Sequence, residues 1–146
     1  MFEALNFDAM AKDEQYSYRN PCDRTDKCAK QTFASGAQRE SDKGKYRPDL
    51  ISPVLITRLG HHLRKGAENH ADRNWEKGIP NNRAMASLMR HTNEYRDGDR
   101  SEDHLAAIVF NAMVIMHNEE MIKRGILDKD LDDMPNYSSR TREVVG

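Results

Sequence analysis

One long apolar run, residues 103–120, constrains the fold of this chain more than any other feature. The run would be apolar on nearly every side of a helix, so it predicts a helix that lies in a core. Polar side chains interrupt it seven residues apart, at His104, Asn111 and Asn118. At about 3.6 residues per turn these positions form one stripe along the helix. Because a buried amide without a partner costs about 1–3 kcal/mol, the stripe needs partners: other side chains, water, or a ligand with its metal.

The length of 146 residues indicates about one domain, and the composition gives that domain few apolar residues. Hydrophobic residues make up 37% of the chain and charged residues 32%. A single subunit would therefore expose apolar helix surface, and we expect a homodimer or homotetramer.

Charge and hydropathy also narrow the expected partners. Acidic and basic residues are interleaved with a net charge of -1, which argues against a nucleic-acid partner. We expect no membrane partner and a cytoplasmic protein, since no run looks long enough to span a membrane and the start lacks a signal-peptide pattern. Cys22 and Cys28 fit neither a disulfide framework nor a zinc site, so we expect reduced thiols.

Three segments are expected in an all-α chain. Residues 1–44 show no sustained period and predict an N-terminal arm of loops, in which residues 2–12 suit a short helix. Residues 45–125 carry helical periods and predict a helical core that would hold an active site. Residues 126–146 predict one short helix and a polar tail.

Capping signals set the expected helix boundaries in the core. Ser52 and Pro53 predict a helix start and Gly66 its end. A second helix is expected over residues 80–97, and Ser101 is expected to cap the central helix.

The short turn before the central helix predicts that the second and central helices are antiparallel neighbours. The end of one then lies beside the start of the other. Five side chains able to bind a metal are expected to converge there, namely His91, Glu94, Asp103, His104 and Asn111. From the residues alone, a purely hydrogen-bonded core network is an equally good interpretation of the buried stripe.

A loop dense in cations precedes the first helix. Its side chains Lys43, Lys45 and Arg47 can reach phosphate oxygens, because an ammonium or a guanidinium forms strong hydrogen bonds with phosphate. A solvated charged loop is the more common structure for such a segment.

A second polar loop, residues 68–78, holds the only tryptophan, Trp75. An indole among polar residues can stack on a base, and the neighbouring amide of Asn74 can read the base edge. A lone tryptophan is nevertheless more often a core anchor than a ligand platform.

Several short blocks together resemble one enzyme family. In chain order they are GAQR at residues 36–39, DKGK at 42–45, RPDL at 47–50, GAE at 66–68, DRNWEKG at 72–78, RH at 90–91, and HLA at 104–106 followed by Asn111. This order is similar to that of the phage and bacterial dATP/dGTP diphosphohydrolases, which look like a branch of the MazG-like all-α nucleoside triphosphate pyrophosphohydrolases.

The resemblance implies a MazG-like helical bundle that forms homodimers or homotetramers. It also implies a divalent metal cofactor, magnesium or manganese, and a purine deoxynucleoside triphosphate as substrate. Hydrolysis of dGTP or dATP to the monophosphate and pyrophosphate would shape the deoxynucleotide pool, in the host cytoplasm if a phage encodes the chain.

The metal-binding motifs depart from the MazG-like pattern. EExxE on one helix and ExxD on the next become RHTNE at residues 90–94 and HLAA at 104–107. Glu94, His91 and His104 are therefore the candidate catalytic residues and metal ligands, with Asp103 and Glu68 as further candidate ligands. Because imidazole suits softer ions than magnesium, the preferred metal can differ. The candidate substrate-binding residues are Lys43, Lys45, Arg47, Asn74, Trp75, Lys77 and Asn111.

Two other functions are open on the sequence. A deoxynucleotide triphosphohydrolase of the histidine–aspartate type needs an adjacent His-Asp pair, whereas here Asp103 precedes His104 and a spacer separates His70 from Asp72. A non-catalytic helical module for oligomerisation or interaction would use the polar stripe only as an interface network.

Overall fold

The computed structural model describes residues 29–137. The chain divides into two units, Met1–Leu50 and Ile51–Gly146. The helix suggested for residues 2–12 and the cysteines Cys22 and Cys28 lie outside the described residues. The segment boundaries expected at residues 44 and 125 stay predictions.

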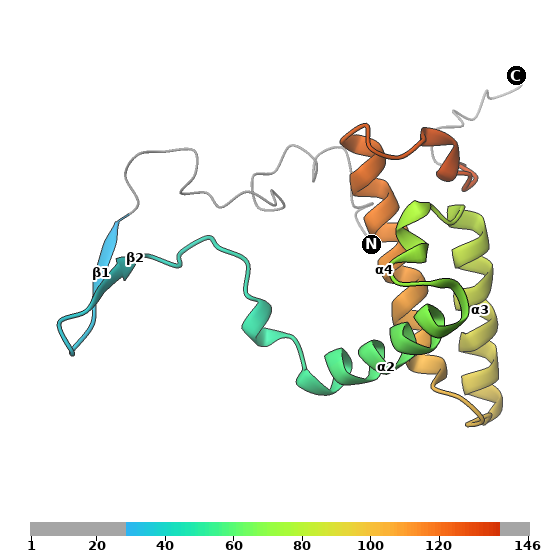
Figure 1. Ribbon diagram of the computed structural model, residues 1–146, viewed down its shortest axis with the longest axis horizontal. Coiled ribbons are helices and arrows are strands. Elements are labelled where there is room, and N and C mark those ends of the chain that lie inside the picture. The colour runs from blue at the N-terminus through green and yellow to red at the C-terminus, as the bar shows by residue number, and fades with distance from the viewer. Residues whose placement is uncertain (1–28, 138–146) are drawn as a thin grey trace, which may run out of the picture. The chain divides into compact units, whose positions relative to one another are not determined.

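A β-hairpin and a 3₁₀ helix make up the described part of the first unit. Strand β1, Lys30–Thr32, pairs antiparallel with β2, Gln38–Glu40, and η3, Pro48–Leu50, follows (Figure 1). Gly36 in the connecting turn has φ +85°, which glycine adopts without strain. Strands of three exposed residues carry no alternation of apolar and polar residues, so the sequence analysis missed this hairpin.

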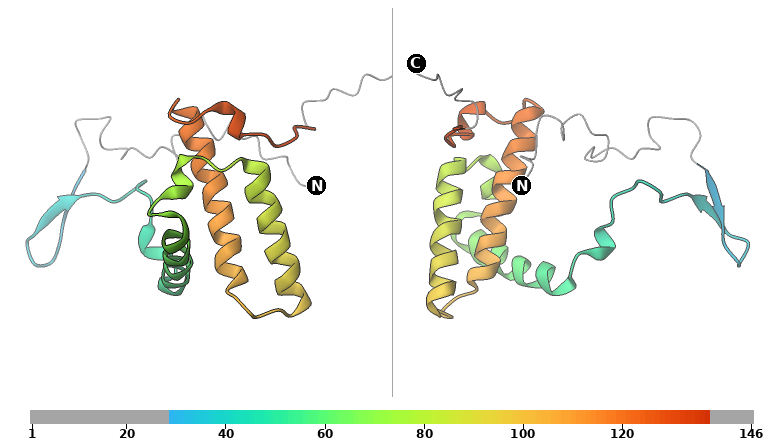
Figure 2. Two further views of the ribbon diagram at one scale, coloured as in Figure 1. Left: turned by 45° about the vertical axis from the view of Figure 1, so that its right-hand side comes forward. Right: turned by 180° about the vertical axis from the view of Figure 1, so that it is seen from behind.

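Three α-helices form the core of the second unit: α2, Pro53–His70, α3, Asn81–Asp97, and α4, His104–Lys123 (Figure 1). They confirm the all-α prediction, to which the hairpin is a small exception. Helices α3 and α4 lie side by side and antiparallel, as their short turn predicts, and α2 packs on α4 (Figure 2).

Two predicted helix boundaries were wrong. Helix α2 continues through Gly66 to His70, because a single glycine costs a helix only about 1 kcal/mol. Helix α4 is capped by Asp103 instead of Ser101, since the carboxylate of Asp103 accepts a hydrogen bond from the amide of Ala106 at 3.1 Å. Ser101 belongs to the preceding turn.

The core of the second unit lies along α4, as the apolar run predicts. The polar stripe is buried as well, since His104, Asn111 and Asn118 are at most 7% exposed. The buried apolar side chains are small, namely Ala84, Ala106, Ala107 and Val114.

Hydrogen bonds to the chain explain the two asparagines of the stripe. The side-chain amide of Asn111 donates to the backbone carbonyl four residues earlier at 2.8 Å and to Ser87 Oγ at 3.3 Å. That of Asn118 donates to the carbonyl of Ile79 at 2.7 Å and to Asn81 Oδ1 at 2.9 Å. For these two residues the structure therefore supports the plainer interpretation, a hydrogen-bonded core network.

The segment after α4 returns to the start of α3. It contains a 3₁₀ helix, η5, Lys129–Leu131, where one short helix was expected. Asp133 accepts a hydrogen bond from the backbone amide of Asn82 at 2.7 Å, which places a negative charge at the positive end of α3. Leu131 covers Gly78 so closely that an added Cβ would stand 2.5 Å from it.

By length and composition alone, α4 could cross a membrane, contrary to the expectation from the sequence. The core helix of a soluble protein meets the same criteria, and the polar stripe of α4 is buried. A cytoplasmic location without a membrane partner stays a prediction.

We predict that the chain is a homodimer or homotetramer, because large apolar side chains remain exposed on the second unit. They include Val54, Ile56, Met89, Met116 and Ile126. Light scattering at micromolar concentration should give at least twice the subunit mass of 16.8 kDa. A monomeric mass would refute this prediction.

Candidate metal centre

Four side chains able to bind a metal meet where α3 ends and α4 begins. His91 and Glu94 come from α3, Glu102 from the turn, and His104 from the first residue of α4. One ligand atom of each lies within 4.8 Å of those of the other three. The antiparallel packing of the two helices thus brings together three of the predicted ligands and adds Glu102.

The separations within this metal-binding group resemble those of a coordination shell. The Nδ1 atoms of His91 and His104 are 3.0 Å apart, and Glu94 Oε2 lies 3.3 Å from the first and 3.2 Å from the second. Glu102 Oε1 lies 3.8 and 3.9 Å from the same nitrogens. Metal bonds of about 2.1 Å place neighbouring ligand atoms about 3.4 Å apart in a tetrahedral site and about 3.0 Å apart in an octahedral one. The group could therefore hold a metal ion after small side-chain movements.

Asp99 orients the buried imidazole of His104. The Nε2 atom of His104 lies 3.2 Å from Asp99 Oδ2 but has no well-aligned hydrogen-bond partner among residues 29–137, so the attraction is mainly electrostatic. The Ser101 amide donates to Asp99 at 2.7 Å and makes the largest contribution to lowering the pKa of Asp99. A carboxylate beside Nε2 favours a proton there, which leaves the Nδ1 lone pair facing the group.

The sequence analysis missed Glu102 and the role of Asp99. Both lie in the irregular turn between α3 and α4, where no periodicity predicts the direction of a side chain. Glu102 could have been recognised as a candidate ligand from its position only two residues before His104.

Asp103 and Glu68, the other two predicted metal ligands, lie outside the metal-binding group and pair with arginines of α2. Asp103 accepts a hydrogen bond from Arg58 Nε at 2.7 Å, and this contact lowers the pKa of Asp103 to about 2. Glu68 pairs with Arg64 one turn earlier. A role for either residue as a ligand stays a prediction.

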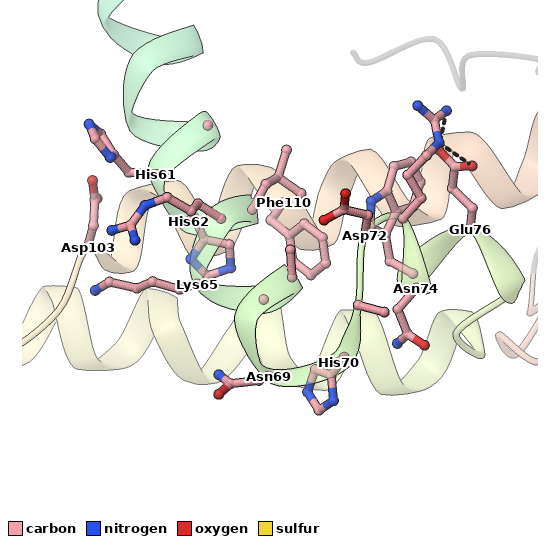
Figure 3. A pocket seen from close by; sticks show the side chains of 18 of the residues that line it. His61, His62, Lys65, Asn69, His70, Asp72, Asn74, Glu76, Asp103 and Phe110 are labelled. Carbon is pink, nitrogen blue, oxygen red and sulfur yellow. Dashed lines mark hydrogen bonds and ion pairs between the residues drawn. The ribbon is translucent and has the colours of Figure 1, made fainter.

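A pocket of about 1060 Å³ opens between α2, the loop that follows α2, and α4 (Figure 3). Glu102 and Asp103 line one part of it, and Asn74 and Trp75 line another. Because Glu102 belongs to both the pocket wall and the metal-binding group, a ligand in the pocket can reach that group.

A family model described as "dATP/dGTP diphosphohydrolase, N-terminal" matches residues 35–129. The chain belongs to this family. The match includes all three helices and every member of the metal-binding group, and it confirms the resemblance found in the sequence. The family description supports a hydrolase in general. Neither the curated proteins nor the solved structures contain a match to this chain.

Two of the predicted substrate-binding residues, Asn74 and Trp75, line the pocket of this family member. The indole of Trp75 also meets the rings of Phe110 and His117 edge-on, with centroids 6.5 and 4.9 Å away. Trp75 thus anchors η4, Asn74–Lys77, on α4 and still borders the pocket, so both interpretations of this residue have structural support.

The other predicted substrate-binding residues have different surroundings. Asn111 is buried and bonded within the core, and Lys77 is exposed in η4 outside the pocket wall. Lys43, Lys45 and Arg47 belong to the first unit, in which Arg47 Nε donates to the carboxylate of its neighbour two residues on at 2.8 Å. Their roles toward a substrate stay predictions.

Asp99→Asn should weaken metal binding without unfolding the chain. Asparagine keeps an oxygen for the Ser101 amide but presents an NH₂ group to His104 Nε2, which favours the tautomer that carries its proton on Nδ1. We expect the Kd for Mn²⁺, measured by titration calorimetry, to rise about 10–100-fold. Asp97→Asn removes the same charge from the exposed end of α3 and should change nothing. An unchanged Kd in Asp99→Asn would contradict the orienting role.

Asp103→Asn separates a structural role from a ligand role. Asparagine can still cap α4 but loses the charge that pairs with Arg58, so we expect unchanged Mn²⁺ affinity and a loss of stability below about 1 kcal/mol. The folded-state pKa of Asp103, about 2, is below its unfolded value of about 3.9. The contribution of the pair is therefore present above the unfolded pKa and lost as pH falls toward 2.

The measurement for this variant is the free energy of unfolding as a function of pH. The difference between wild type and Asp103→Asn should shrink between about pH 4 and about pH 2. A large loss of Mn²⁺ affinity would instead make Asp103 a metal ligand.

Proposed function

We propose that this chain hydrolyses a purine deoxynucleoside triphosphate, dGTP or dATP, to the monophosphate and pyrophosphate with the help of a divalent metal ion. The observation that carries the proposal is the metal-binding group, whose member Glu102 lines a pocket of about 1060 Å³, in a member of the dATP/dGTP diphosphohydrolase family. This volume is at the upper end of the usual range for small-molecule sites. The reaction would shape a cytoplasmic deoxynucleotide pool, that of the host if a phage encodes the chain.

Two imidazole nitrogens and two carboxylate oxygens would hold the metal. Such a mixed set suits manganese or cobalt better than magnesium, which prefers oxygen ligands. When bound, a divalent ion offsets phosphate charge and makes a nearby water easier to deprotonate. We therefore expect manganese to support faster turnover than magnesium.

The side chains of the group differ in how firmly they are held. His104 is 2% exposed and oriented by Asp99, which suits a fixed ligand. Glu102 lies farthest from both imidazoles, is half exposed and borders the pocket. The second carboxylate oxygen of Glu102, which does not bind the metal, is therefore the best placed to accept a proton from the attacking water.

The purine would occupy the part of the pocket bordered by Asn74 and Trp75. Stacking on an aromatic ring contributes about 1–3 kcal/mol per base and tolerates different bases, so Trp75 would supply affinity. The amide of Asn74 offers the directional donor and acceptor that discrimination between guanine and adenine requires.

A non-catalytic interaction module is the second candidate function. It is favoured by the hydrogen bonds that the side-chain NH₂ groups of Asn111 and Asn118 donate within the core, and by the exposed apolar side chains of the second unit. It leaves the convergence of two imidazoles and two carboxylates without a role.

Product analysis with the four deoxynucleoside triphosphates and magnesium, manganese or cobalt tests the proposal. We expect monophosphate and pyrophosphate from a purine substrate. Nucleoside and triphosphate would indicate the histidine–aspartate type of reaction instead. No turnover with any metal would favour the interaction module.

Glu94→Gln should abolish turnover, because glutamine keeps the shape of the side chain but lacks the charge that a divalent ion needs. Circular dichroism should show unchanged helix content. Glu119→Gln makes the same substitution on α4 outside the metal-binding group and should keep wild-type rates. Near-normal turnover of Glu94→Gln at saturating metal would rule out Glu94 as an essential ligand.

A further inference from the structure

Helix α2 turns a stripe of basic and polar side chains toward the pocket. The α2 residues that line it include positions 58, 61, 62, 65 and 69. Apart from the adjacent pair 61 and 62, they are three or four residues apart, which places them on one side of a helix. Figure 3 shows the side chains of His61, His62, Lys65 and Asn69 along this wall. No part of the proposed function so far uses them.

Lys65 differs from the arginines of the pocket lining because it forms no ion pair with the described residues. The three arginines of the pocket lining are already paired, Arg58 with Asp103, and Arg64 and Arg73 with glutamates close in sequence. None of the acidic side chains within residues 29–137 forms an ion pair with Lys65. Its charge is therefore available to an anion in the pocket.

The two histidines beside Lys65 add hydrogen-bond donors. The ring of His62 packs against Phe110 with centroids 5.1 Å apart, which fixes it at the pocket wall. Burial lowers the pKa of His62, so its ring is mainly neutral at pH 7 and offers an N–H group. His61 is exposed on the same stripe and has no hydrogen bond to the described residues.

The direction and length of the stripe suit an extended nucleoside triphosphate. Its first member, Arg58, contacts Asp103, which lines the pocket together with Glu102 of the metal-binding group. From position 58 to position 69 the helix rises about 16 Å, which matches the scale of an extended nucleoside triphosphate. A phosphate chain beside Lys65 would thus lie between the metal-binding group and the end of the pocket at Trp75.

We propose that Lys65, assisted by His61 and His62, binds the phosphate chain of the nucleotide in this pocket. The identity of the nucleotide rests on the proposed function, whereas the binding of a polyphosphate does not. A lysine contributes a compact charge with three donors, and a charged donor forms stronger hydrogen bonds with phosphate oxygens than a neutral one. The site uses residues of the second unit alone.

Binding of inorganic tripolyphosphate to the full chain, in the presence of EDTA, tests this site without a metal. Titration calorimetry should give a Kd for Lys65→Gln at least about tenfold higher than that of the wild type. Lys123→Gln removes the same charge from the far end of α4, outside the pocket, and should leave the Kd unchanged. Equal Kd values for wild type and Lys65→Gln, or no binding by the wild type at millimolar tripolyphosphate, would overturn the proposal.

Turnover of dGTP and dATP by the wild type separates this inference from the proposed function. Turnover together with an unchanged tripolyphosphate Kd in Lys65→Gln would overturn the phosphate site and leave the function standing. Binding that depends on Lys65, in a protein that hydrolyses no deoxynucleotide, would support the phosphate site and overturn the function.

Discussion

The antiparallel packing of α3 against α4 is the interaction on which the second unit depends, and buried polar side chains fix its register. An unsatisfied buried polar group costs about 1–3 kcal/mol, so sliding one helix by a turn would lose several such contacts at once. Apolar contacts alone would tolerate a slip far better, because the buried alanines are small and alike. The contacts that set the register are Asn118 with Asn81, Asn111 with Ser87, and His104 with His91.

The metal-binding group is the last contact of this series, at the end where the two helices are joined by a short turn. Its two histidines are held by helices whose register is already fixed, so the chain needs little further ordering to place their nitrogens 3.0 Å apart. The turn then supplies Glu102 to the group and Asp99 behind His104. A rigid framework thus positions the two histidines, while the carboxylate of Glu102, which lines the pocket, is exposed.

Sequence periodicity predicts the helices and the meeting of their histidines, but not the side chains of the turn or the end of α2. The apolar run and the seven-residue spacing predict α4 and its buried stripe, and the short turn predicts that His91 and Glu94 lie near His104. Periodicity gives no direction for side chains in turns, which is why Asp99 and Glu102 were missed. Helix α2 was predicted to end at Gly66 because glycine is a common helix C-cap, whereas the helix continues to His70.

Helix α2 is the wall of the pocket with the least burial, since none of its residues is fully buried in a single chain. Its contacts with α4 and the residue that caps α4 include the ring contact of His62 with Phe110 and the ion pair of Arg58 with Asp103. Local opening free energy follows buried contact, so α2 should be the helix of lowest local stability in the second unit. A polyanion that bridges α2 to the rest of the pocket would then raise that stability, and ligand affinity would include the free energy of ordering this helix.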